Sequence, residues 1–297
     1  MIKSAKSKRA AAVSCLLLAT MIWGTSFPIL KISLQAFTPL WFLGIRFLAA
    51  TLIMLVICLP RLKKLNRNML KDGLLLGLPV ALAYTTQTIG LMYTSTANNA
   101  FITATYVVIV PFLVWGSGKK IRGVNFLIAA ATLAGLAVFS LSDTLTIASG
   151  DIWTIACAFL FAVHMTMLGS LSSRHDPFLL TLLQLLMVSL VNTLLAIIFE
   201  APPTAASFTP SIIGSLAYCA VFPSIACYLI QTWVQSILSP MTTSILMMSE
   251  AIWGSLFGYL MLNEGFGTRK FIGAAILLTC IIASVILDNR AAKKTQS

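Results

Sequence analysis

Ten long apolar segments constrain the fold of this chain more than any other feature. They cover residues 11–32, 39–59, 72–92, 98–116, 122–141, 152–171, 178–199, 210–232, 241–261 and 269–287. Each is close to the roughly 20 apolar residues that a helix needs to cross a bilayer. Of the 297 residues 59% are apolar and only 9% are charged, which excludes both a soluble domain and a disordered chain. The sequence therefore predicts an all-α integral membrane protein with ten transmembrane helices.

The basic residues are unevenly distributed between the two sets of loops. With ten alternating spans and the N-terminus in the cytoplasm, the inner segments hold sixteen Lys and Arg, and the outer loops hold only Arg269 and Lys270. The positive-inside rule then predicts that both termini are cytoplasmic, in the inner (plasma) membrane of a bacterial-type cell. This topology accounts for the net charge of +12, so no nucleic-acid partner is expected. The first segment runs on past Pro28 without a cleavage pattern, which favours an uncleaved span over a signal peptide.

The two halves of the chain are weakly similar to each other. Pro39 and Pro177 open matching segments at an offset of 138, and Tyr84–Thr88 matches Tyr228–Thr232 at an offset of 144. The similarity predicts two units of five spans, residues 1–146 and 147–297. Because five is odd, the second unit must insert upside down. Inverted repeats of this kind are typical of secondary transporters, whose substrate site lies near the midplane of the membrane.

Short motifs along both halves give the sequence a family resemblance. They are Trp23-Gly24-Thr25-Ser26-Phe27, Arg46-Phe47-Leu48-Ala49-Ala50, Ala97–Thr103, Tyr106–Pro111, Ser239-Pro240, Ser249-Glu250, Leu262-Asn263-Glu264 and Gly273-Ala274-Ala275. In this order and spacing the chain resembles the EamA-like ten-span exporters of the drug/metabolite transporter superfamily. One departure is Ala251, where the family often has a proline. The resemblance implies secondary transport, usually export of metabolites, amino acids or toxic compounds.

Glu250, His164 and Arg46 lie away from the ends of predicted spans, where a charge is costly and therefore a functional candidate, whereas Lys31 lies near the outer end of its span and is expected to extend to the interface. Glu250 could take up and release a proton, or it could accept hydrogen bonds from a neighbouring helix. His164 could titrate near neutral pH, or it could be a buried histidine with its hydrogen bonds satisfied. Arg46 could hold an anionic substrate group, extend to the interface, or pair with Glu250. The two candidates for coupling are Glu250 and His164.

Neutral polar and aromatic residues form stripes along several predicted helices. Since lipid offers no hydrogen-bond partner, these stripes must face protein or a wet cavity. The candidate substrate-binding residues are Trp23, Tyr84, Gln87, Asn99, Thr103, Tyr106, His164, Tyr228, Gln231 and Trp253. Such a mixture suits an amphiphilic or aromatic small molecule better than a bare ion. The six cysteines lie within apolar segments without metal-ligand spacing, so no metal or other cofactor is expected.

The leading hypothesis is a secondary transporter that works by alternating access. It would export a small metabolite, amino acid or drug-like compound, with protons or exchange as the energy source, because the sequence contains no P-loop motif. A passive facilitator or channel of the same fold is the first alternative. An intramembrane enzyme is the second, and it would need paired catalytic groups such as Glu250 and His164. We expect no enzymatic activity.

Overall fold

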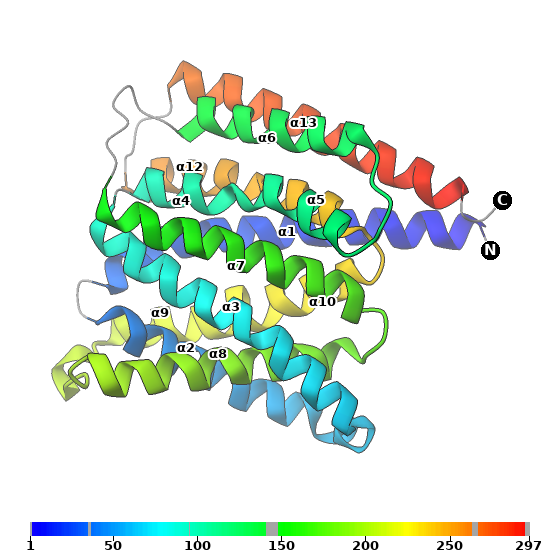
Figure 1. Ribbon diagram of the computed structural model, residues 1–297. Coiled ribbons are helices and arrows are strands. Elements are labelled where there is room, and N and C mark those ends of the chain that lie inside the picture. Colours follow the sequence, from blue (N-terminus) through cyan, green and yellow to red (C-terminus); the bar gives the residue numbers. More distant parts are fainter. Residues whose placement is uncertain (1, 35–36, 95, 141–147, 263–266, 295–297) are drawn as a thin grey trace.

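All regular secondary structure in the described part of the chain is helical (Figure 1). The computed structural model describes residues 2–34, 37–94, 96–140, 148–262 and 267–294. The α-helices are α1 Ile2–Ser33, α2 Pro39–Cys58, α3 Arg67–Tyr93, α4 Thr96–Ala104, α5 Tyr106–Gly116, α6 Gly123–Ser140, α7 Ser149–Leu171, α8 Pro177–Phe199, α9 Pro210–Cys219, α10 Cys227–Gln235, α11 Pro240–Met247, α12 Ser249–Leu262 and α13 Thr268–Lys294. Two short 3-10 helices, η1 Leu59–Lys64 and η2 Ala205–Ser207, and a π-helical segment, η3 Ala220–Ala226, complete the order. The prediction of an all-α fold is confirmed.

Seven helical stretches are long and apolar enough to cross a membrane. They are Ser7–Ser26, Pro39–Lys64, Arg67–Tyr93, Ser149–Leu171, Pro177–Phe199, Pro210–Gln235 and Thr268–Ala291. The other three predicted segments are also helical, but they are shorter or divided. Segment 122–141 contains α6, while segment 98–116 is divided at Thr105 and segment 241–261 at Met248. The chain is therefore a multi-pass helical membrane protein.

The helix starts follow from local sequence. Helices α8, α9 and α11 each begin with a proline, which lacks the N–H that a first turn leaves unsatisfied. The residues before these prolines are Asp176, Thr209 and Ser239, and each side chain accepts a hydrogen bond from a backbone N–H of the first turn. The boundaries between spans are thus encoded residue by residue.

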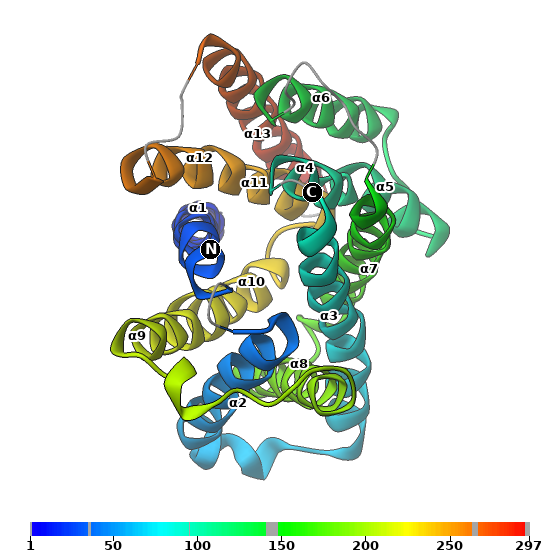
Figure 2. The ribbon, with the colours of Figure 1, turned by 90° about the vertical axis from the view of Figure 1, so that its left-hand side faces the viewer.

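The helices pack as a bundle with a pair at each edge. Helices α6 and α13 lie side by side at one edge, and α2 and α8 do so at the opposite edge (Figures 1 and 2). Between them α3 packs along α7 and α8, while α1 packs against α12 and α10. This arrangement encloses the middle parts of α1, α3, α7 and α10, where the candidates Trp23, Tyr84, Gln87, His164, Tyr228 and Gln231 lie.

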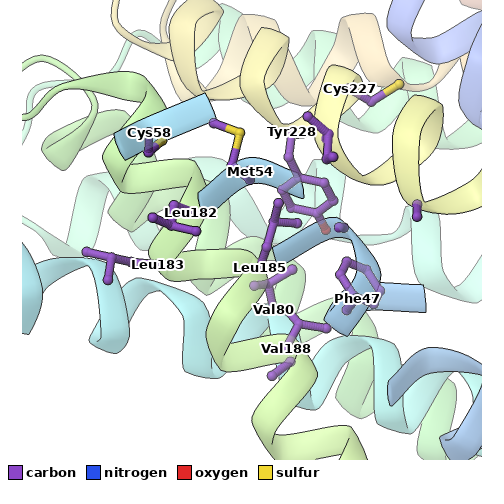
Figure 3. Close-up of a cluster of buried hydrophobic side chains, with 14 of the residues drawn as sticks. Phe47, Met54, Cys58, Val80, Leu182, Leu183, Leu185, Val188, Cys227 and Tyr228 are labelled. Carbon is purple, nitrogen blue, oxygen red and sulfur yellow. The ribbon is translucent and has the colours of Figure 1, made fainter. Parts of the chain in front are cut away.

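A buried apolar cluster joins the α2–α8 edge to the interior. Figure 3 shows side chains from α2, α3, α8 and α10 in this cluster: Phe47, Met54, Cys58, Val80, Leu182, Leu183, Leu185, Val188, Cys227 and Tyr228. Tyr84 packs against both Phe47 and Tyr228, so the aromatic end of the cluster adjoins the centre of the bundle. Burial of this surface ties the edge pair to the central helices.

Ion pairs connect the loops and helices at the end of the bundle where both chain termini lie (Figure 1). We call this the basic end, because the loops that follow α2, α5 and α7 bring their Lys and Arg residues there. His175 Nε2 lies 2.8 Å from Asp72 Oδ2, and Lys64 Nζ lies 3.6 Å from Asp176 Oδ2. Arg9 of α1 pairs with Asp288 of α13. At the opposite end, Glu200 accepts hydrogen bonds from the first backbone N–H groups of α2.

Close packing of α7 on the C-terminal turn of α3 predicts that Gly150 is sensitive to substitution. A Cβ at Gly150 would lie 2.8 Å from the backbone carbon of Tyr93, and this backbone cannot rotate away. We expect Gly150→Ala to lower the unfolding free energy by about 1–3 kcal/mol through overpacking. The matched control is Gly214→Ala in α9, where nothing lies within 4 Å of the new Cβ. Thermal unfolding of both variants in detergent checks this, and equal stability of the two would contradict it.

Candidate functional site

Four aromatic side chains from four helices meet at the centre of the bundle. The rings of Tyr84 in α3 and Tyr228 in α10 have centroids 6.3 Å apart. Trp23 of α1 packs edge-on against Tyr228 at 6.0 Å, and Phe161 of α7 packs edge-on against Tyr84 at 5.7 Å. Tyr106 of α5 extends the group, with its ring 6.3 Å from Phe161. The structure therefore brings together four of the predicted residues, Trp23, Tyr84, Tyr106 and Tyr228.

Arg46 of α2 borders this aromatic group. Its Nε donates a hydrogen bond to Ser224 Oγ at 2.9 Å, and its guanidinium carbon lies 4.9 Å from the ring centroid of Phe47 and 5.9 Å from that of Tyr84. The side chain is only 3% exposed, so it does not extend to the membrane interface. Within the described residues Arg46 pairs with no carboxylate, Glu250 included. Two of the three expected roles for Arg46 are thereby wrong.

Glu250 lies in the first turn of α12 and faces the interior of the bundle. Its carboxylate is within electrostatic range of Tyr84, Tyr106 and Tyr228, which come from three different helices. The residue is half-buried, and no residue in the described ranges gives it a hydrogen bond or an ion pair. An interior carboxylate that is left without a protein partner remains available to a proton or a ligand.

His164 of α7 has a protein partner. Its Nε2 lies 2.8 Å from Oε1 of Gln184 in α8. The amide of Gln184 is oriented by its Nε2, which donates to the carbonyl of Leu180 at 3.2 Å, so Oε1 is the acceptor and Nε2 of His164 carries the proton. The ring of His164 is 6.3 Å from that of Tyr228, and the side chain is 1% exposed. This geometry favours the satisfied structural histidine over a titrating group.

The predicted polar stripes of α3 and α4 are engaged in helix-to-helix hydrogen bonds. Asn99 Nδ2 donates to the carbonyl of Gln87 at 3.1 Å and to Thr154 Oγ1 at 3.0 Å. Gln87 Nε2 donates to Thr103 Oγ1 at 3.4 Å. These bonds join α3, α4 and α7. Of Gln87, Asn99 and Thr103 only Gln87 stays half-buried, so it is the member best placed to meet a ligand.

The remaining predicted residues lie near α11 and α12. Gln231 is buried and its Nε2 lies 3.7 Å from the sulfur of Met247. Trp253 is half-buried and packs closely against Gly24 of α1. A Cβ added to Gly24 would lie 2.7 Å from the Cβ of Trp253. Gln231 therefore joins α10 to α11, and Trp253 joins α12 to α1.

Three residues of the central group are absent from the candidates that the sequence yields. They are Phe161, Gln184 and Ser224. A signal exists for Phe161, because it follows Trp23 at the same offset that relates Pro177 to Pro39. No comparable signal exists for Ser224, whose role depends on the π-helical turn that carries it.

The described chain is an all-helical, multi-pass membrane protein with ionisable and aromatic side chains in its interior, an arrangement typical of membrane transport proteins. The sequence model of the EamA-like transporter family matches the chain twice, over residues 10–141 and 148–286. The chain belongs to this family, which is consistent with the drug/metabolite transporter superfamily.

Two relatives agree with this assignment, and a solved structure shares the fold. An "uncharacterized transporter" of Archaeoglobus fulgidus is 30% identical over 93% of this chain and 86% of its own length. The "uncharacterized transporter YoaV" of Bacillus subtilis is 22% identical over 91% of this chain and 95% of its own. A protein of known crystal structure matches with a TM-score of 0.77 over 95% of this chain and 99% of its own, at 14% identity, and so shares the fold.

The buried contact between His164 and Gln184 predicts a measurable coupling energy. Each single variant, His164→Leu or Gln184→Leu, leaves one buried polar group without its partner and should cost about 1–3 kcal/mol of unfolding free energy. The double variant should cost less than the two single variants together, because both partners are then apolar. Equilibrium unfolding in mixed micelles measures the cycle. Additive effects would show that the two side chains do not interact.

Proposed function

We propose that this protein is a secondary transporter that exports a small amphiphilic or aromatic molecule by alternating access between two inverted five-helix repeats. Family membership supports transport as the activity. The observation that carries the mechanism is Glu250, an interior carboxylate without a protein partner in the described part of the chain. The partners of the proposed transporter are the lipid bilayer, protons and one small-molecule substrate.

Contacts between side chains at matching positions support the inverted repeat. Tyr84 and Tyr228 match at an offset of 144, and their rings are neighbours. Trp23 and Phe161 match at an offset of 138, and each packs against the tyrosine of the other half. Equivalent residues that make equivalent contacts are expected of a two-fold axis that runs through the tyrosine pair.

The packing of the helices supports the same symmetry. Under a 1–146 and 147–297 division, α2 matches α8 and α6 matches α13, and each of these pairs is in contact. The contact of α3 with α7 matches that of α10 with α1, and the contacts of α4 and α5 with α7 match those of α11 and α12 with α1. The interruptions at Thr105 and Met248 also fall at corresponding places. The boundary at residue 146 itself lies outside the described residues.

The distribution of charge supports an orientation. The basic end holds both termini and the loops that contain Lys64, Lys119 and Arg174 (Figure 1). By the positive-inside rule this end faces the cytoplasm. In the proposed topology the chain therefore crosses the inner (plasma) membrane ten times, and both termini are cytoplasmic.

Glu250 is the proposed carrier of the coupling proton. Glu250 has no ion-pair partner among the described residues, so no protein cation holds its carboxyl group in one protonation state. Tyr84, Tyr106, Tyr228 and Cys227 are the titratable groups within its electrostatic range. Proton release to one side and uptake from the other would then drive the exchange of the two conformations. His164 is the weaker coupling candidate, because Gln184 already occupies its Nε2.

Replacement of Glu250 by Gln tests the coupling. In inside-out vesicles we expect the wild-type protein to accumulate one class from a panel of amino acids, nucleosides and aromatic cations when a proton gradient is imposed. Glu250→Gln should reduce this uptake to gradient-independent equilibration, because the side chain can no longer release a proton.

The matched control for this experiment is Glu200→Gln. Glu200 lies outside the central group and accepts backbone hydrogen bonds from α2, which a glutamine oxygen can also accept. It should leave gradient-driven uptake unchanged. Gradient-independent equilibration by the wild type itself would favour the passive facilitator and return Glu250 to a structural role.

A further inference from the structure

A positive charge is buried in the centre of this protein, and no described residue acts as its counter-ion. The guanidinium of Arg46 is 3% exposed and lies within the bundle. Carboxylates balance several cations at the ends of the bundle: Asp176 lies near Lys64, and Asp288 pairs with Arg9. No such carboxylate meets Arg46 among the described residues. Because an uncompensated buried charge is strongly destabilising, its presence calls for a partner from outside the protein.

The hydrogen-bonding capacity of Arg46 is mostly unused. Only Nε has a protein acceptor, Ser224 Oγ at 2.9 Å. The two terminal nitrogens, Nη1 and Nη2, have no acceptor in the described part of the chain. Neither is among the described side-chain atoms that are both completely enclosed and without a partner, which belong to Trp41, Ser172, Gln235 and Thr243. The edge of the guanidinium that can bind a carboxylate in two parallel hydrogen bonds therefore lacks a protein acceptor and is not completely enclosed.

The surroundings of Arg46 hold its guanidinium in one orientation. Ser224 donates its own hydroxyl proton to the carbonyl of Cys219 at 2.9 Å, so a lone pair of Oγ is directed at Nε of Arg46. The rings of Phe47 and Tyr84 flank the guanidinium within cation–π distance. This arrangement pre-organises a planar donor beside an apolar aromatic wall, as recognition of an organic anion requires.

The counterpart of Arg46 in the other half differs in charge. Gln184 is that counterpart, at the offset of 138 that relates α2 to α8. Gln184 uses its amide within the protein, where it binds His164 and Leu180. If the fold alone needed a polar group here, a neutral amide would suffice, as it does in α8. The charge of Arg46 is therefore an addition to what packing requires.

We infer that Arg46 binds the carboxylate of an organic anion whose apolar body lies against Tyr84 and Tyr228. This inference rests on the proposed transport function and specifies its substrate class. The carboxylate bonds to Nη1 and Nη2, while Nε stays on Ser224. Ser224 and Phe47 act as positioning residues, and Arg46 is the residue that distinguishes an anion from its neutral analogue.

Matched ligand pairs test the inference. The probes are phenylacetate with phenylacetamide and phenylalanine with phenylalanine amide, which keep the aromatic body and remove the carboxylate. Binding to the purified full chain is measured by tryptophan fluorescence, since Trp23 packs against Tyr228. We expect at least one carboxylate to bind about tenfold or more tightly than its amide, as a charge-assisted bidentate bond should provide. Arg46→Gln should abolish that preference and leave amide binding unchanged.

Two further variants keep the result interpretable. The comparison of carboxylate with amide within one sample cancels any loss of folded protein, so a destabilised Arg46→Gln still gives a valid ratio. Arg46→Lys retains the charge but loses the planar fork, and it should keep only part of the preference. The control is Arg61→Gln at the basic end, far from the aromatic centre, which should retain the full preference.

Three outcomes would overturn the inference. The carboxylate preference could survive in Arg46→Gln, or the wild type could bind amides as well as carboxylates. The wild type could also transport neutral or cationic compounds from the vesicle panel while binding no carboxylate. That result would support the proposed transport function and refute the anion site. If the vesicles moved no compound of any charge, the failure would lie in the proposed transport function. A preference lost only in Arg46 variants supports the site.

Discussion

Lipid offers no hydrogen-bond partner, and this constraint shapes the whole molecule. Backbone groups are satisfied within helices, and side-chain amides and hydroxyls must turn toward other helices. Asn99 and Gln184 meet this requirement with partners on neighbouring helices. Arg46 meets it only through Ser224, and Glu250 has no hydrogen-bond or ion-pair partner among the described residues. The difference separates the polar residues that hold the bundle together from those that remain available for chemistry.

Much of the fold could be predicted from the sequence, because both the apolar segments and the residues that begin the helices can be recognised in it. Apolar length predicts the spans, and prolines after Asp176, Thr209 and Ser239 mark their starts. Seven stretches reach full spanning length, whereas the segments around Thr105 and Met248 are divided. Hydropathy does not report such interruptions, because a turn between two apolar helices leaves the composition unchanged.

The candidate site could be predicted in membership but not in the role of each residue. Trp23, Tyr84 and Tyr228 are expected to lie together, and they do. The state of His164 depends on Gln184, which stands in another helix, so no local pattern could reveal it. For the same reason the role of Arg46 follows only from its distance to Ser224 and its separation from Glu250. The sequence predicts which face of a helix carries a side chain, but the partners of that side chain depend on how the helices pack.

Two charged side chains interrupt the symmetry of the central group. Arg46 matches Gln184 at an offset of 138, and Glu250 matches Tyr106 at an offset of 144. In each pair one half carries the charge and the other carries a neutral residue. The electrostatic range of both charges includes Tyr84 and Tyr228. A ligand between the tyrosines would therefore lie within the electrostatic range of both a cation and a carboxylate. In the proposed transporter this difference between the two halves would orient the substrate, which two identical halves would not do.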